Sequence, residues 1–232
     1  MLRGISIAVG SIWVIASHIA KPGSLNFDEC FTTIDDELYE RNAGGHSIID
    51  DAVSAVSTAD WPKFELLSIQ RVWSWLTQIA DFRTRSSKSK LGRAIGAITY
   101  LINPSHADEN VLGLVWALIG LEALYGNTNQ GLRSQLLDKS EAYLGPRSSH
   151  SKQFGWMYDF RSRFIHGDLD FVFQHHDFGG DAAADKFIDD AFRSQELAIA
   201  MLIATVQRMC IDGRQQLAFE YVVTPSASTV AG

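Results

Sequence analysis

From about residue 88 onward, apolar residues recur every three or four positions, in segments separated by short polar or glycine-containing breaks. This period predicts a series of helices, at residues 88–102, 111–125, 130–144, 151–166 and 185–212. The breaks that end the first four are Asn103-Pro104, Gly126-Asn127, Gly145-Pro146 and Gly167. Residues 111–125 are apolar around nearly the whole helix circumference, which predicts a central position in a helical bundle.

The first 80 residues have a less regular pattern. Trp61-Pro62 is typical of a helix start, and the apolar positions after it predict a helix to about residue 80. Residues 4–20 contain no Asp, Glu, Lys or Arg and are rich in Ile and Val, which favours one or two buried strands. The same stretch follows Arg3 and also fits a signal peptide at residues 1–16, or a membrane anchor at the short limit of length.

These patterns together predict a mainly α protein. A helical bundle is expected at residues 83–214, after a small N-terminal region, 1–82, that contains some β-strand. Residues 215–232 are expected to form a partly disordered tail, in which 219–223 has the composition of a short strand. The 232 residues provide enough chain to bury a core in one large domain or two small ones.

Composition restricts the classes of function. The chain has 20 Lys and Arg against 27 Asp and Glu, a net charge of −7, which argues against nonspecific coating of nucleic acid but leaves room for a local basic site. Two cysteines, Cys30 and Cys210, exclude a disulfide framework and a tetrahedral cysteine site for zinc, and they favour a cytoplasmic location. The basic run at 83–93 fits either a solvated loop or a contact with an RNA backbone, and His175-His176-Asp177 lacks a third metal ligand at a recognisable spacing.

One charged residue interrupts the most apolar helix. Glu122 is the only formally charged residue between Val111 and Tyr125. A buried carboxylate is costly unless a cation or several donors meet it. Glu122 therefore either emerges into solvent at the helix end or orients an Arg or His on a neighbouring helix.

A candidate for that partner lies about 40 residues later. Arg161 and His166 are separated by four residues, and Gly167 follows at once. On an unbroken helix their directions differ by about 140°, but Gly167 is a natural left-handed C-cap, so we expect His166 to be freed at the helix end to converge with Arg161 on one phosphate. Guanidinium binds phosphate in a bidentate manner, and imidazole transfers protons near neutral pH. The alternative is an arginine paired with Asp159 and a capping histidine.

Three segments, in this order, resemble the Apea-like branch of the HEPN superfamily. They read ALIGLEALY at 117–125, LDKSEAYLG at 137–145 and YDFRSRFIHG at 158–167, of which the last is the most specific. The resemblance covers about residues 88–212 and nothing before residue 80. In one departure, Lys139 stands where the family pattern has Arg, which keeps the charge and loses the bidentate geometry.

The resemblance implies an all-helical bundle that dimerises and cleaves RNA without a metal or any small-molecule cofactor. Arg161 would stabilise the scissile phosphate and His166 would transfer a proton to or from the 2′-hydroxyl or the leaving oxygen, at a composite site where the motifs of a homodimer meet. Ser162 and Glu122 would support these two residues, and Arg163 and Lys139 would contact RNA.

The resulting hypothesis is a metal-independent endoribonuclease of the HEPN type that leaves a 2′,3′-cyclic phosphate. It would act in phage defence or stress response, with RNA and a second copy as partners and no membrane. The alternative is a catalytically silent HEPN module used for dimerisation or for binding RNA or protein.

Overall fold

The computed structural model describes residues 15–21, 48–57, 61–83, 87–102, 110–127, 131–147, 151–169 and 182–220. Within these ranges the chain is helical and contains no β-strand, which confirms the mainly α class. A helical stretch at residues 15–20 comes first. It is followed by α4 (Ile48–Ser57), α5 (Ile69–Leu76), the 3-10 helix η1 (Ala80–Arg83), α6 (Lys90–Leu101), α7 (Asn110–Tyr125), α8 (Leu132–Leu144), α9 (Ser151–His166) and α10 (Ala182–Ile211).

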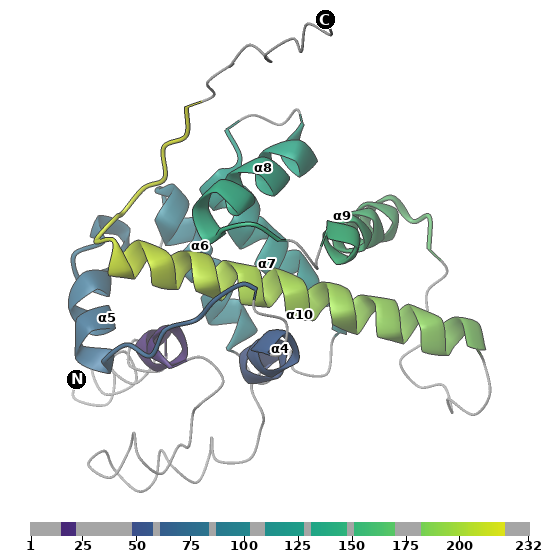
Figure 1. Cartoon of the computed structure of the whole chain (residues 1–232), viewed down its shortest axis with the longest axis horizontal. Coiled ribbons are helices and arrows are strands. Elements are labelled where there is room, and N and C mark those ends of the chain that lie inside the picture. The colour runs from purple at the N-terminus through teal and green to yellow at the C-terminus, as the bar shows by residue number, and fades with distance from the viewer. Residues whose placement is uncertain are drawn as a thin grey trace, which may run out of the picture.

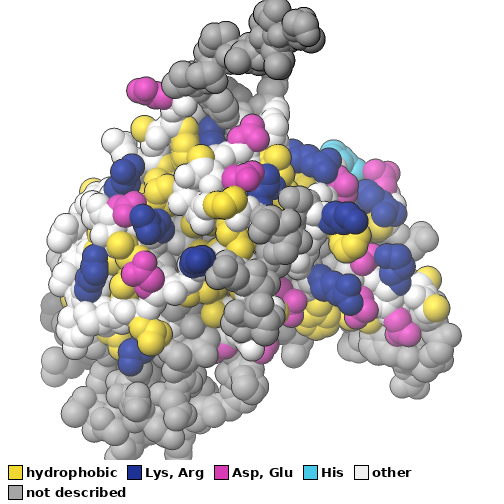
Figure 2. Space-filling view, in the orientation of Figure 1, with side chains coloured by type: hydrophobic (Ala, Val, Ile, Leu, Met, Phe, Trp, Pro, Cys, Tyr) yellow, Lys and Arg dark blue, Asp and Glu magenta, His cyan; other side chains and the backbone are white. Residues whose placement is uncertain are grey.

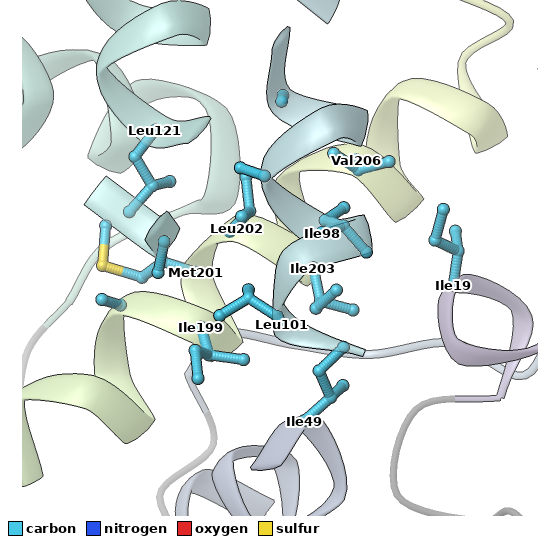
Figure 3. Close-up of a cluster of buried hydrophobic side chains, with 14 of the residues drawn as sticks. Ile19, Ile49, Ile98, Leu101, Leu121, Ile199, Met201, Leu202, Ile203 and Val206 are labelled. Atoms are coloured by element: carbon cyan, nitrogen blue, oxygen red, sulfur yellow. The ribbon is translucent and has the colours of Figure 1, made fainter. Parts of the chain in front are cut away.

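Helix α10 is the axis around which the others are arranged (Figure 1). Its 30 residues span about 45 Å, and it packs against α4, α7 and α9. Figure 3 shows the centre of the core, where side chains of α10 meet Ile98 and Leu101 of α6 and Leu121 of α7. Helix α7 lies between α10 and α6, in the central position that its apolar circumference predicts.

Two glycines bring α7 close to α10. A Cβ atom added at Gly120 would lie 2.9 Å from both terminal carbons of Leu202, and one added at Gly113 would overlap the side-chain amide of Gln195. The glycines are seven residues apart, so they lie on the same side of α7. Their missing side chains leave the space that α10 fills.

Another side of α7, about 100° around the helix from these glycines, is open. Leu112 and Ile119 are exposed there, and the ring of Trp116 is stacked on Tyr100 of α6 with centroids 4.0 Å apart. We call these exposed apolar residues, Leu112 and Ile119, the open side of α7. It reaches Glu122, three residues after Ile119, at its C-terminal end.

The N-terminal segments share one core with the bundle. Ile19 and Ile49 are both buried in it (Figure 3). The side-chain amide of Gln207 in α10 donates to the carbonyl oxygens of Ile19 at 2.9 Å and Glu65 at 2.6 Å, and accepts from the Glu65 amide at 2.8 Å. The domain boundary expected at residue 82 therefore does not coincide with a break in the packed core.

The strand expected within residues 4–20 is wrong where the structure describes it. Residues 15–20 are helical and buried, and the rest of that stretch lies outside the described residues. The burial that the composition predicts is present, but a helix provides it.

The helix expected from Pro62 begins only at Ile69. Ser68 is its N-cap, and the Ser68 hydroxyl accepts from the Arg71 amide at 3.3 Å. Residues 61–68 are not helical because they bond to distant segments: the Leu67 amide donates to the Ala20 carbonyl at 2.8 Å, and Glu65 is held by Gln207.

The C-terminal segment follows α10 without regular structure as far as residue 220. The ring of Phe219 lies 5.9 Å from that of Tyr125, so the segment covers the C-terminal end of α7. The strand expected at 219–223 is absent at 219–220, and residues 221–232 lie outside the described ranges, as do Cys30 and residues 175–177. No helix among the described residues is both long and apolar enough to cross a membrane.

Candidate functional site

Helix α9 carries the Arg-x4-His motif and ends where the sequence predicts. Gly167 has φ of 75°, and two hydrogen bonds close the helix end: the Gly167 amide donates to the Phe164 carbonyl at 3.2 Å and the Asp168 amide to the Arg163 carbonyl at 2.8 Å. This is the Schellman arrangement, for which glycine is favoured because it adopts positive φ without steric cost. The expected glycine C-cap is therefore present.

Arg161 faces α7 and pairs with Glu122. Its Nη2 lies 3.5 Å from Oε1 of Glu122, and the side chains are 28% and 18% exposed. Of the two alternatives for Glu122, the structure thus has the one in which it meets a cation of a neighbouring helix. The pair is half-buried, so the guanidinium keeps an edge open to solvent.

Tyr158 touches both members of this pair. Its hydroxyl donates to Oε1 of Glu122 at 3.3 Å, and its ring centroid lies 5.9 Å from Cζ of Arg161, within the range of a cation–π contact. Burial raises the pKa of the Tyr158 phenol, and the negative charge of Glu122 raises it further. The phenol therefore stays protonated and remains a donor to Glu122.

Asp159 is bound by α8 and not by Arg161. Its Oδ1 lies 2.9 Å from Nη1 of Arg133. The alternative interpretation of the motif, in which Asp159 neutralises Arg161, is therefore wrong. The two ion pairs instead connect α9 to α7 and to α8.

His166 lies on another side of α9 from Arg161. The helix continues without a break through His166, so the two side chains leave the helix axis about 140° apart. The expectation that Gly167 frees His166 to converge with Arg161 within one chain is wrong. The left-handed backbone conformation occurs at Gly167, one residue after His166, so it does not change the direction of the His166 side chain. The imidazole is exposed, and Ser162, four residues before it, shares its side of the helix rather than that of Arg161.

Lys139 is not available to RNA in this structure. Only 2% of the residue is exposed, and its ammonium donates to the Tyr125 carbonyl at 2.7 Å and to Oε1 of Gln135 at 2.9 Å. Burial lowers the pKa of Lys139, and the charge of Lys90 lowers it further. The predicted RNA contact at Lys139 is therefore wrong, and the residue caps the C-terminal end of α7.

The remaining basic candidates differ in accessibility. Arg163 is exposed, and its Nη2 lies 3.4 Å from the Asp168 carbonyl. In the basic run at 83–93, the Lys90 ammonium is held by the Gly126 carbonyl and by Oδ1 of Asn127, each at 2.7 Å, while Arg93 is exposed. Arg163 thus remains a candidate for RNA contact, whereas Lys90 is engaged within the fold.

Sequence reasoning missed two residues of this site, Tyr158 and Arg133. Tyr158 lies three residues before Arg161, and this spacing places neighbours on one side of a helix. Arg133 has no comparable signal, because its pairing depends on how α8 packs beside α9. Within the described ranges, no group of three or more His, Cys, Asp or Glu side chains is placed to hold a metal ion.

The site has one group that can bind an anion and one that can transfer a proton, and the two lie on different sides of α9. Arg161 offers a guanidinium oriented by Glu122 and Tyr158, and His166 offers an exposed imidazole at a fixed helix end. No protein-family model, curated protein or solved structure matches the chain. The likeness to the HEPN superfamily therefore rests on the residues of the three motifs.

Proposed function

We propose that the protein is a metal-independent endoribonuclease of the HEPN type. The observation that carries this proposal is the Arg161–Glu122 ion pair, 3.5 Å long and open at one edge. It orients the guanidinium of Arg161 on the helix that also carries the exposed imidazole of His166 on another side, and these are two groups suited to phosphodiester cleavage by a neighbouring hydroxyl. Action in phage defence or stress response, and a cytoplasmic location, stay predictions.

In the proposed reaction, the His166 imidazole accepts the proton of a ribose 2′-hydroxyl. The 2′-oxygen forms a bond to the adjacent phosphorus, and the bond from phosphorus to the 5′-oxygen breaks, which leaves a 2′,3′-cyclic phosphate. The 5′-oxygen takes a proton from solvent or from an imidazolium. A positioned acid or base contributes roughly 10²–10⁴-fold, and Arg161 adds on the order of 10²–10³-fold by stabilising the charge on the phosphorane.

We propose further that the site is composite, with Arg161 and His166 supplied by two copies of the chain. Side chains about 140° apart on one helix reach a common phosphate more easily when a second α9 lies opposite. The open side of α7 is a suitable contact for that copy, because it leaves Leu112 and Ile119 exposed and borders Glu122. Leu112 and Ile119 lie seven residues apart, so they share one side of α7 and a single contact covers both.

The primary experiment follows RNA cleavage by purified protein in EDTA. Wild type should cut single-stranded RNA and leave cyclic phosphate ends, while Arg161→Ala and His166→Ala should show no cleavage above background. His166→Ala should keep the wild-type melting temperature, because the imidazole is exposed. Arg161→Ala removes the cation beside Glu122 and should lower the melting temperature, so its activity is compared below the unfolding transition. Equal activity of wild type and His166→Ala, or a strict metal requirement, would remove the nuclease proposal.

Mixing the two inactive variants tests the composite site. In a mixed dimer, one site combines the intact Arg161 of one chain with the intact His166 of the other. Random mixing should restore about a quarter of wild-type activity, since half of the dimers are mixed and half of their sites are intact. Mixtures that remain inactive would place both residues of each site in one chain.

A catalytically silent binding module is the second candidate. The separation of Arg161 and His166 on α9 favours it, because one chain alone does not assemble a catalytic pair. Such a module would bind RNA without cleaving it, and His166→Ala would then leave affinity unchanged.

A further inference from the structure

An exposed tryptophan lies between two cations on the side of α9 that faces away from the core. Trp156 is 58% exposed, and Lys152 and Arg163 are exposed as well. Lys152 lies about one turn before Trp156 and Arg163 about two turns after it, so the three share one side of the helix. His166 is the neighbour of Arg163 one turn further on.

The positive charge on this side of α9 is not cancelled by its own carboxylate. Asp159 is the one acidic residue in α9, and it is held by Arg133 of α8 at 2.9 Å. Figure 2 shows Lys and Arg side chains gathered over α9 around a histidine, with some carboxylates between them. In a chain with a net charge of −7, such a local basic surface favours an anionic partner.

The chemistry of this surface fits an unpaired nucleotide better than a protein. An exposed aromatic ring offers a face on which a base can stack, and flanking cations meet the phosphates on either side. A protein partner would be expected to find further apolar side chains beside the tryptophan. The helix neighbours of Trp156 on this side are instead Lys152, Asp159 and Arg163, in contrast to the aliphatic open side of α7.

We infer that Trp156 is a base-stacking residue for single-stranded RNA, with Lys152 and Arg163 on the adjoining phosphates. This inference rests on the proposal that RNA is the ligand of the site, and it adds the class of RNA and the path of the strand. His166 lies ten positions after Trp156, which is about 15 Å along the helix. The strand therefore runs along α9 toward the proposed catalytic histidine.

The test measures binding of a short, fluorescent, 2′-O-methylated RNA by anisotropy. Methylation blocks the attacking hydroxyl, so binding is read without cleavage. Trp156→Ala should weaken binding of the single strand about tenfold or more, whereas Trp156→Phe, which keeps a ring, should retain most of the affinity. Phe192→Ala is the matched control, because it removes an aromatic ring that is 42% exposed on α10, and it should change nothing.

The same oligonucleotide annealed to its complement provides a second arm. Paired bases are not free to stack on a side chain, so Trp156→Ala should bind the duplex as wild type does. A loss confined to the single strand, in a variant that keeps the wild-type melting temperature, supports the inference. An equal loss for both RNAs would overturn it in favour of a general electrostatic contact.

Failure of this inference is distinguishable from failure of the nuclease proposal. Equal affinity of wild type and Trp156→Ala for the single strand overturns the stacking role, whatever the cleavage assay gives. Binding that depends on Trp156 without cleavage of unmodified RNA upholds the stacking role and favours the silent module. A change in oligomeric mass without a change in RNA affinity would assign Trp156 to a protein contact and overturn the inference.

Discussion

Replacing Gln207 with leucine should weaken the attachment of the N-terminal segments to α10 and leave the apolar packing around α10 unchanged. Leucine has a similar volume, so the core around α10 stays filled, but all three hydrogen bonds of the amide are lost. The Ile19 carbonyl then stays buried without a donor, and the amide and carbonyl of Glu65, which are partly buried, lose their partner.

The expected cost follows from the burial of each group. An unsatisfied buried acceptor costs about 1–3 kcal/mol, and each partly buried hydrogen bond contributes roughly 0.5–1.5 kcal/mol. Because the two bonds to Glu65 can be replaced in part by water, we expect a total of roughly 2–4 kcal/mol. For a chain of this size that lowers Tm by roughly 5–15 °C.

Thermal and urea denaturation measure this loss, and Gln215→Leu is the matched control. The Gln215 side chain also donates to a backbone carbonyl, that of Gln78 at 3.2 Å, but the bond is exposed, so its removal should cost less than about 0.5 kcal/mol. Hydrogen exchange should also accelerate at the Glu65 and Leu67 amides. If Gln207→Leu costs no more than Gln215→Leu, or if these amides exchange as in wild type, the assigned anchoring role is refuted.

Further predictions concern RNA binding, alkaline stability and assembly. Arg163→Ala should weaken RNA binding and reduce the dependence of log affinity on log salt by about 0.7 for a single strand; an unchanged slope would count against a phosphate contact. Burial raises the pKa of Tyr125, whose hydroxyl is bonded to that of Thr205 at 2.8 Å. The unfolded chain ionises first, so the Tyr125 phenol by itself should lower wild-type stability above about pH 10 by up to about 1.4 kcal/mol per pH unit. In urea titrations at a series of pH values, the unfolding free energy of Tyr125→Phe should fall less steeply with pH than that of wild type. Parallel curves for the two proteins would contradict this. Ile119→Asp should shift the mass measured by light scattering toward the monomer, and an unchanged mass would move the dimer contact elsewhere.

The bundle helices were predictable because their signals are local. Apolar period and capping residues define α6 to α10 to within a few residues, and Gly167 ends α9 through backbone conformation alone. The pairing of Glu122 with a cation was also accessible, since a lone carboxylate in an apolar helix needs a partner. Its partner Arg161 belongs to the motif that the sequence singles out.

The features that the sequence did not predict depend on contacts between distant segments. Residues 61–68 have a helical composition, but Gln207, 142 positions after Glu65, binds their backbone and holds them out of a helix. The sequence around Lys139 is typical of a basic surface residue. The side chain is buried because α8 packs beside the C-terminal end of α7. The direction of the His166 side chain depends on whether the helix ends before or after this residue. Local sequence patterns do not fix a helix end to within one residue.

The burial of Lys139 changes the meaning of the lysine found where the resembled family has arginine. A lysine offers three N–H groups on a compact tip, and two of them meet the Tyr125 carbonyl and Gln135. A guanidinium would bring five N–H groups on a wide planar fork into the same enclosed space. Lys139→Arg would therefore not create a phosphate-binding site at this position; the wider guanidinium would push α8 away from α7, because the space is already occupied by contacts that hold the two helices together.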